Sequence, residues 1–217
     1  LPSLTIVGLP EMAVRESKER VRSALINSGF EFPNRRVTIN LAPADLPKQG
    51  GRYDLAIAMG ILCATGQIEV HTLQQYEFLG ELALTGELRP VSGVLPTAIA
   101  CIKEGLSLFV PHESAYEASL ASEGIIFAAK HLSEICQHLK ELQKLEAISF
   151  NAPDIQARSL PDLSEVKGQY QARRALELAA AGRHNLLFYG PPGTGKSMLA
   201  ARLPSILPPL SQKETVE

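Results

Sequence analysis

The sequence predicts an α/β protein in which a mixed-sheet domain is followed by the beginning of a second domain. Short strand-like runs alternate with segments of helical periodicity over residues 3–147. Two strand-like runs within residues 78–91 are joined around Thr85 and Gly86, which predicts one antiparallel hairpin beside the parallel units. A further apolar run leads into a glycine-rich loop after residue 165. These observations together indicate one complete α/β domain and part of another.

The composition is that of an ordinary globular protein. The 217 residues are 45% hydrophobic and 20% charged, which suffices for one domain plus part of a second. The formal net charge of −2 argues against a strongly basic surface that coats nucleic acid. Residues 1–12 lack the features of a secretory signal. No apolar run reaches the roughly 18 residues of a membrane span, so we expect a cytoplasmic protein without a membrane partner.

Hydrophobic periodicity places the elements of the first domain, residues 1–147. Strands are predicted at residues 3–7, 36–41, 106–110 and 125–129, in addition to the two arms of the hairpin. Helices are predicted at residues 11–29, 54–64, 94–104, 114–122 and 132–147. The helix at 54–64 is apolar nearly all round and is therefore expected to be buried.

Several side chains in these helices carry specific predictions. Gly29 and Gly105 are placed to end the helices that precede them. In the first helix, one inward face is predicted to hold Val14, Ser17, Val21, Ala24, Leu25 and Ser28. The pairs Glu11–Arg15 and Glu16–Arg20 are expected on its outer surface. In the last helix, core positions are assigned to Ile135, Leu139 and Leu142.

The periodic pattern breaks at residues 148–164, which hold two prolines and several polar residues and are predicted to be a linker. The second domain is assigned to residues 165–217. It is predicted to begin with a helix near 169–181, a buried strand at 185–189, and a helix from 196 to about 203.

The loop GPPGTGKS, residues 190–197, matches the phosphate-binding pattern G-x-x-x-x-G-K-[ST]. Its glycines permit positive φ and let backbone N–H groups approach phosphate oxygens, and the following helix adds its positive dipole end. Lys196 can reach the β- and γ-phosphates, and the Ser197 hydroxyl can ligate Mg²⁺. A chance match in a chain of this length is expected less than about once in a hundred. We therefore predict an ATP and Mg²⁺ site formed by Gly190, Pro191, Pro192, Gly193, Thr194, Gly195, Lys196 and Ser197.

This form of the loop, with EVKGQYQARRAL about two dozen residues upstream, resembles the AAA+ branch of the P-loop ATPases. The resemblance implies that Val166 and Gly168 lie near the adenine base; the alternative is an amphipathic helix that merely packs on the sheet. Hydrolysis in this class also needs a second strand that ends in acidic residues, and no such run follows Ser197. We therefore expect a fragment, starting at Leu1 rather than Met and cut inside its ATPase domain, that binds nucleotide at most while its parent hydrolyses ATP.

Residues 35–112 resemble the proteolytic domain of Lon-type proteases, whose fold is related to the second domain of a ribosomal protein. In that frame Asp54 stands where the nucleophilic Ser would be, and Leu95 stands where the Lys base would be. Ser92 lies nearby, but no Lys or His is placed to activate it. Because loss of a protease nucleophile alone costs on the order of 10⁶ in turnover, we expect a Lon-like domain without peptidase activity.

The stretch of residues 50–54, GGRYD, has two interpretations. In the structural one, Asp54 caps the buried helix while the two glycines turn the chain. In the functional one, Arg52 and Tyr53 present a charge and an aromatic face to DNA or to a partner subunit. DNA contact by this domain is also suggested by a group of arginines, although interleaved acids make solvation the commoner role: Arg20, Arg22, Arg35 and Arg36.

The whole combination resembles the ComM/YifB family of bacterial magnesium-chelatase-like proteins, most specifically through NLAPADLPKQGGRYDL at residues 40–55. The resemblance implies a homo-hexameric AAA+ ATPase whose competence member is a DNA branch-migration helicase in natural transformation. The magnesium-chelatase ATPase subunit lacks a Lon-like leader, which favours the DNA role. The alternatives are a chelatase-type ATPase that remodels a protein or metal-insertion partner, and a Lon-like module that serves assembly or docking.

The cysteines and histidines predict no metal or disulfide chemistry. Cys63, Cys101 and Cys136 are far apart in apolar segments and are expected to be buried, reduced thiols. The five histidines show no metal-ligand spacing. His131 and His138 are seven residues apart without a third ligand, and surface or helix-end positions are expected for them.

Overall fold

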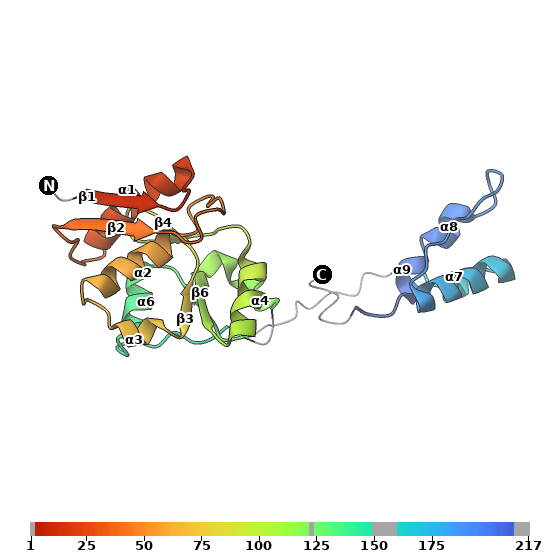
Figure 1. Cartoon of the computed structure of the whole chain (residues 1–217). Coiled ribbons are helices and arrows are strands. Elements are labelled where there is room, and N and C mark those ends of the chain that lie inside the picture. Colours follow the sequence, from red (N-terminus) through yellow and green to blue (C-terminus); the bar gives the residue numbers. More distant parts are fainter. Residues whose placement is uncertain (1–2, 122–123, 149–159, 211–217) are drawn as a thin grey trace. The chain divides into compact units, whose positions relative to one another are not determined.

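The computed structural model describes residues 3–121, 124–148 and 160–210 (Figure 1). These residues form two compact units, Leu1–Asn151 and Ala152–Glu217. Most of the predicted linker, residues 149–159, lies outside the described residues. Its two described ends join folded parts: the Ile148 N–H donates to the Ile126 carbonyl at 2.8 Å, and Leu163 is buried in the second unit.

The first unit confirms the predicted α/β class and most of the predicted elements. Its order is β1 (Ser3–Val7), α1 (Met12–Asn27), β2 (Arg36–Asn40), α2 (Asp54–Ala64), α3 (Val70–Leu73), β3 (Tyr76–Phe78), β4 (Glu81–Leu82), β5 (Leu88–Arg89), α4 (Val94–Glu104), β6 (Ser107–Pro111), α5 (Ala115–Ser119), β7 (Ile126–Ala129) and α6 (Leu132–Leu139). The short helix α3 was not predicted. The Lon-like assignment of this unit stays a prediction.

The strands of the described residues pair in three separate sheets, so the prediction of one mixed sheet is wrong. β1 and β2 are parallel, β3, β6 and β7 form a parallel sheet in the order β3-β6-β7, and β4 and β5 form the predicted antiparallel hairpin. The chain leaves the β3-β6-β7 sheet at Gly80, whose N–H donates to Arg52 and whose carbonyl accepts from Leu55. These bonds, to the turn before α2 and to the first turn of α2, hold the chain where it leaves the sheet for the hairpin.

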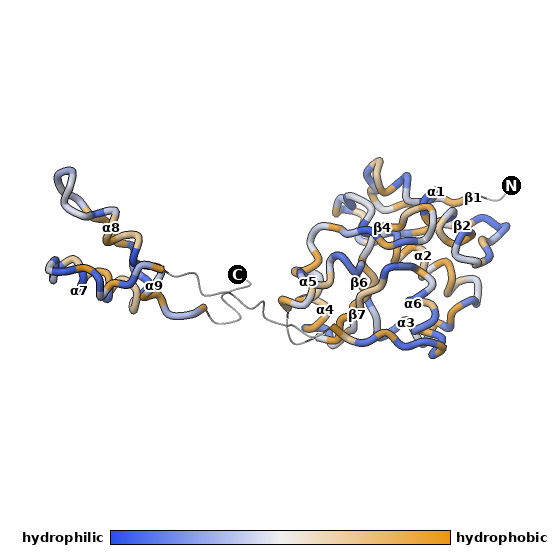
Figure 2. The backbone as a smooth tube through the Cα atoms, turned by 180° about the vertical axis from the view of Figure 1, so that it is seen from behind, coloured by the Kyte–Doolittle hydropathy of each residue, from blue (hydrophilic) through white to orange (hydrophobic). Residues whose placement is uncertain are grey.

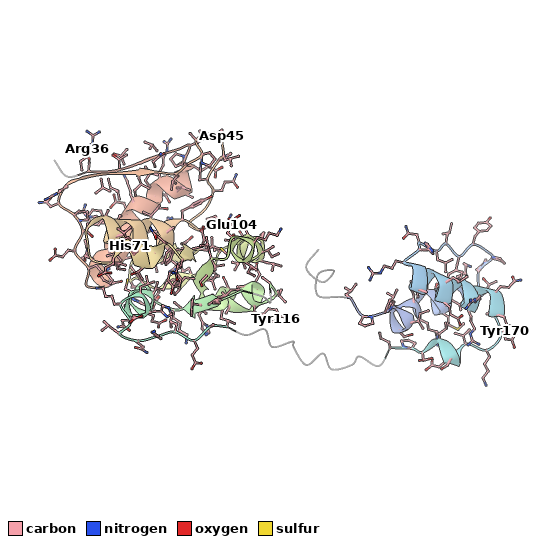
Figure 3. The ribbon with its side chains drawn as sticks, turned by 60° about the horizontal axis from the view of Figure 1, so that its bottom comes forward. Arg36, Asp45, His71, Glu104, Tyr116 and Tyr170 are labelled. Carbon is pink, nitrogen blue, oxygen red and sulfur yellow. The ribbon has the colours of Figure 1, made fainter. Side chains whose placement is uncertain are left out.

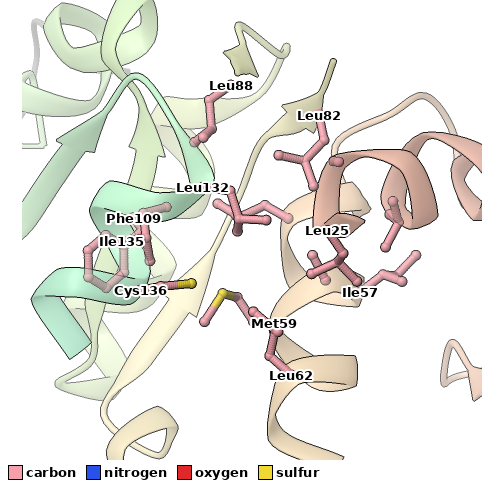
Figure 4. Packing of buried hydrophobic residues seen from close by; sticks show 14 of the residues in the cluster. Leu25, Ile57, Met59, Leu62, Leu82, Leu88, Phe109, Leu132, Ile135 and Cys136 are labelled. Atoms are coloured by element: carbon pink, nitrogen blue, oxygen red, sulfur yellow. The ribbon is translucent and has the colours of Figure 1, made fainter. Parts of the chain in front are cut away.

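The main core lies where α1, α2 and α6 meet the sheet strands. Leu25 of α1, Leu62 of α2, Phe109 of β6 and Leu132 of α6 are each 0% exposed. Figure 4 shows Met59 of α2 and Cys136 of α6 pointing toward each other in this cluster. A smaller cluster packs α4 and α5 against the other side chains of β6 and β7. Burial of each such Leu or Phe stabilises the fold by about 1.5–3 kcal/mol.

The helix α2 is buried as predicted, because its apolar residues follow one another without a polar interruption after Asp54, as the hydropathy colouring of Figure 2 traces. The fully exposed residues of α2 are small: Ala56, Gly60 and Ala64.

The ends of α1 and α6 differ in how well the sequence predicted them. Gly29 ends α1 with a φ of 81°, as expected. The last helix stops at Leu139, although residues up to 147 were predicted to be helical. The His138 ring nitrogen Nδ1 accepts from the Leu145 N–H at 2.9 Å, and this bond holds the chain in a turn. Leu142 is consequently 76% exposed, and its predicted core position is wrong.

The second unit contains a 3₁₀ turn (Leu163–Glu165), α7 (Tyr170–Gly182), α8 (Lys196–Ala200) and α9 (Leu203–Ile206). The predicted helix at 169–181 is confirmed by α7. The predicted helix from 196 is interrupted after α8, because Pro204 has no N–H to continue the ladder. Four residues form the small core of this unit: Leu163, Val166, Leu176 and Leu199.

The predicted buried strand at 185–189 is wrong. None of these five residues is in a strand, and Leu187 and Tyr189 are 87% and 98% exposed. A strand requires a neighbour to satisfy its backbone donors and acceptors. Residues 160–210 contain no strand that could pair with it.

Candidate functional site

The glycine-rich loop at residues 190–197 turns the chain into α8. The φ values of Gly190, Gly193 and Gly195 are 154°, 84° and 83°, a region that residues with side chains rarely adopt. Gly195 is the residue that precedes the first helical residue, Lys196. The loop thus has the backbone conformations predicted from its three glycines.

The Lys196 side chain folds back over this loop. Its Nζ donates to the carbonyl oxygens of Gly190 at 2.9 Å and Pro191 at 2.6 Å, and it lies 3.4 Å from the Thr194 hydroxyl. The Thr194 hydroxyl itself donates to Pro191 at 3.0 Å. Lys196 takes part in none of the ion pairs of the described residues. An ammonium held only by neutral oxygens can exchange them for a phosphate.

The segment upstream of α7 contacts the same loop. The Gln169 amide donates to the Thr194 carbonyl at 3.3 Å, from a backbone with φ of 52° just before α7. The Val166 side chain is 2% exposed and packs in the core of the unit, so its side chain serves packing. Arg173 of α7 donates to the Val166 carbonyl at 3.2 Å. Gln169, which the sequence did not single out, is the residue that links this segment to the loop.

The residues of the loop fit a nucleoside triphosphate with Mg²⁺. A Cβ built on Gly193 would meet no atom within 4 Å, so space is open beside its backbone. Ser197 is exposed at the first turn of α8, and Lys196 has no acidic partner among the described ion pairs. The donor set of backbone N–H groups, an ammonium and a hydroxyl is the one that phosphates and Mg²⁺ require.

In the first unit, Asp54 forms a buried ion pair. Its carboxylate is 0% exposed and accepts from Arg20 Nε at 2.7 Å and Arg20 Nη2 at 3.2 Å. The Leu82 N–H donates to the same carboxylate at 3.3 Å. The hydrogen bond to Asp54 raises the pKa of Arg20 against the opposing effect of burial.

Two predictions about these residues are wrong. Asp54 does not cap α2, since the residue at the cap position is Tyr53 and no side chain accepts a capping bond there. Arg20 does not lie on the outer surface of α1, because its guanidinium turns inward to Asp54. At the position where the Lon-like resemblance would put a nucleophilic Ser, the chain carries a carboxylate bound by a guanidinium.

The neighbouring residues are engaged in packing and backbone contacts. Leu95 lies in the first turn of α4, where its N–H donates to the Glu117 carboxylate at 3.1 Å. The Arg52 guanidinium donates to the Ser92 carbonyl, and Tyr53 is half-buried against the main core. Residues 50–54 thus have structural contacts, although these are not the Asp54 cap that the structural interpretation expected.

The histidines and cysteines of the described residues form no metal-binding cluster. No group of three His, Cys, Asp or Glu side chains in the described part of the chain could hold a metal ion. Cys101 and Cys136 are buried free thiols as predicted, and burial raises their pKa values to about 11 and about 12. Cys63 is only half-buried.

The two singled-out histidines have separate structural roles. His131 precedes α6 as expected of a helix-end residue, and its Nδ1 accepts from the Ser133 N–H at 3.1 Å. His138 lies in the last turn of α6, a helix-end position as expected, but it is 8% exposed and packs among Tyr76, Phe109 and Phe127 rather than on the surface.

No helix in residues 3–121, 124–148 or 160–210 is long and apolar enough to cross a bilayer.

Comparison with known proteins identifies relatives of the whole chain. A family model described as subunit ChlI of Mg-chelatase matches residues 1–114, and one described as magnesium chelatase, subunit ChlI, matches residues 162–217. The chain is 52% identical to YifB of Salmonella typhimurium, 49% identical to competence protein ComM of Haemophilus influenzae and 50% identical to YifB of Escherichia coli. Each alignment covers 100% of this chain and 43% of the relative.

These comparisons correct one step of the sequence argument. The model that matches residues 1–114 is itself described as a Mg-chelatase subunit, so the leader does not separate a DNA role from a chelatase-type role. The family does not depend on that step, because the first model matches more than half of the chain and the relatives are similar over all of it. The chain belongs to the ComM/YifB family of Mg-chelatase-like proteins.

Proposed function

We propose that this chain is the ATP-binding, amino-terminal part of a hexameric AAA+ ATPase that acts as a DNA branch-migration helicase in natural transformation or recombination. The observation that carries the proposal is the phosphate loop, with its three glycines at positive φ and an ammonium that forms no ion pair with an acidic side chain of residues 3–121, 124–148 and 160–210. The 49% identity to a competence protein supports the DNA role. Because the chain spans 43% of the length of that relative, the hydrolytic residues are assigned to the remainder.

Each residue of the loop has a role in this proposal. Lys196 exchanges its bonds to Gly190 and Pro191 for phosphate oxygens, which neutralises part of the phosphate charge. Ser197 ligates Mg²⁺. Thr194 keeps the loop closed through its bond to Pro191. Bound ATP supplies the free energy of phosphoanhydride hydrolysis that drives movement along DNA.

The first unit has a non-proteolytic role in this proposal, in assembly of the hexamer or in docking of DNA. Catalysis of peptide hydrolysis needs a nucleophile activated by a base. Asp54 is bound by Arg20, and Leu95 stands at the position aligned with the base. Asp54 and Leu95 therefore cannot act as a nucleophile and base in this proposal, and the unit acts through its surface. A cytoplasmic location is part of the proposal, as DNA and ATP are found there.

The second candidate function is a chelatase-type ATPase that remodels a protein or a metal-insertion partner. The observation that favours it is the description of both matching family models as subunit ChlI of magnesium chelatase. It uses the same ATP and Mg²⁺ site, so the nucleotide loop cannot distinguish the two. The response of hydrolysis to DNA does.

The distinguishing experiment measures ATP hydrolysis by the full-length protein with and without single-stranded and branched DNA. We expect DNA to stimulate hydrolysis strongly and Lys196→Ala to abolish the stimulated rate. Hydrolysis that is indifferent to DNA would reject the helicase and leave the remodelling ATPase as the function.

Nucleotide binding by the 217-residue chain is tested separately with a fluorescent ATP analogue. Removal of a charge-assisted hydrogen bond costs about 1.5–3 kcal/mol, so Lys196→Ala should weaken binding by about tenfold to a hundredfold. Lys103→Ala is the control, because Lys103 is an exposed lysine that lies in the other unit, away from the nucleotide loop. Equal affinities of the two variants would contradict the role of Lys196.

A further inference from the structure

A groove of about 630 Å³ lies between the outer side of α1, the start of β1 and the loop before β2. Three basic residues line it, Lys18 and Arg22 from α1 and Arg35 from the loop, against a single acidic residue, Glu19. The groove therefore gathers positive charge on a chain whose overall formal charge is −2.

The cations of the groove are available to a ligand. Lys18, Arg22 and Arg35 are exposed, and none of them takes part in an ion pair of the described residues. Lys18 and Arg22 are four residues apart and so lie on the same side of α1. Arg20, in contrast, is bound to Asp54 in the interior. Within about one turn of α1, the Arg20 side chain thus points into the interior, and Lys18 and Arg22 point to solvent.

An aromatic ring orders one of these cations. The guanidinium carbon of Arg22 lies 5.4 Å from the centroid of the Phe32 ring, a cation–π contact. Phe32 is half-buried and packs against the main core, so its ring is fixed in place. A guanidinium held over an aromatic ring keeps its other face open, and nucleobases stack on such a face.

The two-stranded sheet next to the groove has a polar outer side. β1 and β2 alternate between exposed and half-buried residues, and Thr5 faces Thr38 on the exposed side. Figure 3 shows Arg36, at the start of β2, on the outer side of this sheet. Hydroxyl and guanidinium donors at these positions suit further contacts to phosphate and sugar oxygens.

We propose that the groove of Lys18, Arg22, Phe32 and Arg35 binds single-stranded DNA, with the cations on successive phosphates and the Arg22–Phe32 pair as a platform for one base. The inference rests on the proposed DNA function and gives the first unit its contact with that DNA. The recess between α1, the start of β1 and the loop before β2 sets its cations beside the Arg22–Phe32 stacking platform, on which the unpaired bases of a single strand can stack and the paired bases of a duplex cannot. An acidic peptide would use the cations but would leave the stacking platform without a partner.

The test measures fluorescence anisotropy of a labelled twenty-nucleotide oligo(dT) with the 217-residue chain, without nucleotide and at several salt concentrations. The groove variant is Lys18→Gln with Arg22→Gln, and the control is Arg89→Gln with Lys103→Gln. Both remove one exposed lysine and one exposed arginine of the first unit. Each phosphate contact to a single strand adds about 0.7 to the salt slope, so the groove variant should lose about 1.4 and bind at least about tenfold more weakly at low salt. The control should change less than twofold.

A second variant keeps the inference open to refutation should the first fold poorly. Arg35→Gln changes one exposed loop residue and should lower the salt slope by about 0.7. Equal losses in the groove and control variants, no binding of oligo(dT) by the unchanged chain, or preference for polyglutamate over oligo(dT) would each overturn the inference. These results do not depend on ATP hydrolysis. Failure of the proposed helicase function is recognised separately, by ATP hydrolysis that does not respond to DNA.

Discussion

The carboxylate of Asp54 ties three elements of the first unit together. It begins α2, accepts from Arg20 of α1, and accepts from the Leu82 N–H of β4. The two partners of the ion pair differ in their access to water, because the Arg20 side chain is 21% exposed and the Asp54 side chain is 0% exposed. Loss of the Arg20 charge and loss of the Asp54 charge should therefore change the free energy of unfolding by different amounts.

We predict that Arg20→Met destabilises the fold more than Asp54→Asn. Removal of Arg20 leaves a buried carboxylate without a cation, which costs about 3–5 kcal/mol. Asp54→Asn keeps the shape and an acceptor, and Arg20 can turn to water and to Ser17, so a cost of about 1–2 kcal/mol is expected. Urea unfolding of the two variants measures this difference, and equal costs would contradict it.

His138 makes the first unit sensitive to acid. Burial, with a smaller contribution from Lys144, lowers the pKa of His138 below its usual value of 6.5. The unfolded chain therefore binds the proton more readily than the folded chain. The stability that the neutral ring contributes is present above pH 6.5 and is lost as the pH falls through the lower folded pKa. Protonation of Nδ1 would also remove the acceptor of the Leu145 N–H.

We predict that the loss of stability on acidification is smaller in His138→Gln than in the unchanged chain. The measurement is the free energy of unfolding at pH 7.5 and at pH 5, taken as a difference between the two proteins so that other groups cancel. His71→Gln is the control, since His71 is exposed in α3. An identical pH dependence in all three proteins would show that His138 has no such role.

At the scale of helices, two glycines of the first unit have opposite requirements. Gly60 lies within α2, is exposed, and a Cβ there would meet no atom within 4 Å. Gly105 ends α4 with a φ of 70°, also in open space. We predict that Gly60→Ala stabilises the unit by about 0.5–1 kcal/mol, through helix propensity. Gly105→Ala should destabilise it by about 1–2 kcal/mol, through its left-handed backbone.

Thermal unfolding of both glycine variants tests this pair directly. Because neither added methyl group meets a neighbour, the sign of each effect comes from the backbone alone. Shifts of the same sign in the two variants would contradict the argument.

Elements of the first unit were predictable where local pattern and tertiary packing agree. The apolar run of α2 and the glycine end of α4 follow from the sequence because burial and helix geometry require them. The length of α6 was not predictable from periodicity. The helix ends at Leu139, and the His138 ring then accepts from the Leu145 N–H, a bond that the spacing of apolar residues does not indicate. The separate hairpin depends on the bonds of Gly80 to the turn before α2, which periodicity does not report.

The candidate sites divide in the same way. The phosphate loop is local, so its spacing alone predicted the positive φ of Gly193 and Gly195. The Arg20–Asp54 pair joins residues that are 34 positions apart, and no pattern within α1 or α2 indicates it. The one available signal was an acidic residue opening an otherwise apolar helix. The exposed segment at 185–189 shows the converse, since its strand-like composition has no partner in the described residues.

We predict that the backbone amides of residues 185–189 exchange with deuterium far faster than those of α2. No backbone hydrogen bond within the described part of the chain has one of these five amides as its donor. Hydrogen exchange with mass spectrometry measures the difference, with a peptide from α2 as the internal reference. Slow exchange at 185–189 would contradict the exposed conformation.

At the scale of the molecule, the two units have cores of very different size. The first unit has two hydrophobic clusters, the larger of which contains Leu25, Leu62 and Phe109. The second unit has one cluster of four buried residues. Since stability comes mainly from buried apolar area, the second unit is expected to be the less stable of the two.

We predict that urea unfolds the chain in two steps, the second unit at lower urea and the first unit at higher urea. ATP with Mg²⁺ should raise only the urea midpoint of the second unit. A ligand at one hundred times its Kd stabilises the unit that binds it by about 2.7 kcal/mol. Because the loop at 190–197 belongs to the second unit, its exchange protection should rise with nucleotide while that of α2 stays constant. In Lys196→Ala this rise should be absent. The urea midpoints of both units should then be the same with and without nucleotide. If ATP also shifted the unfolding midpoint of the first unit, nucleotide binding would be transmitted to the unit that holds the proposed DNA groove.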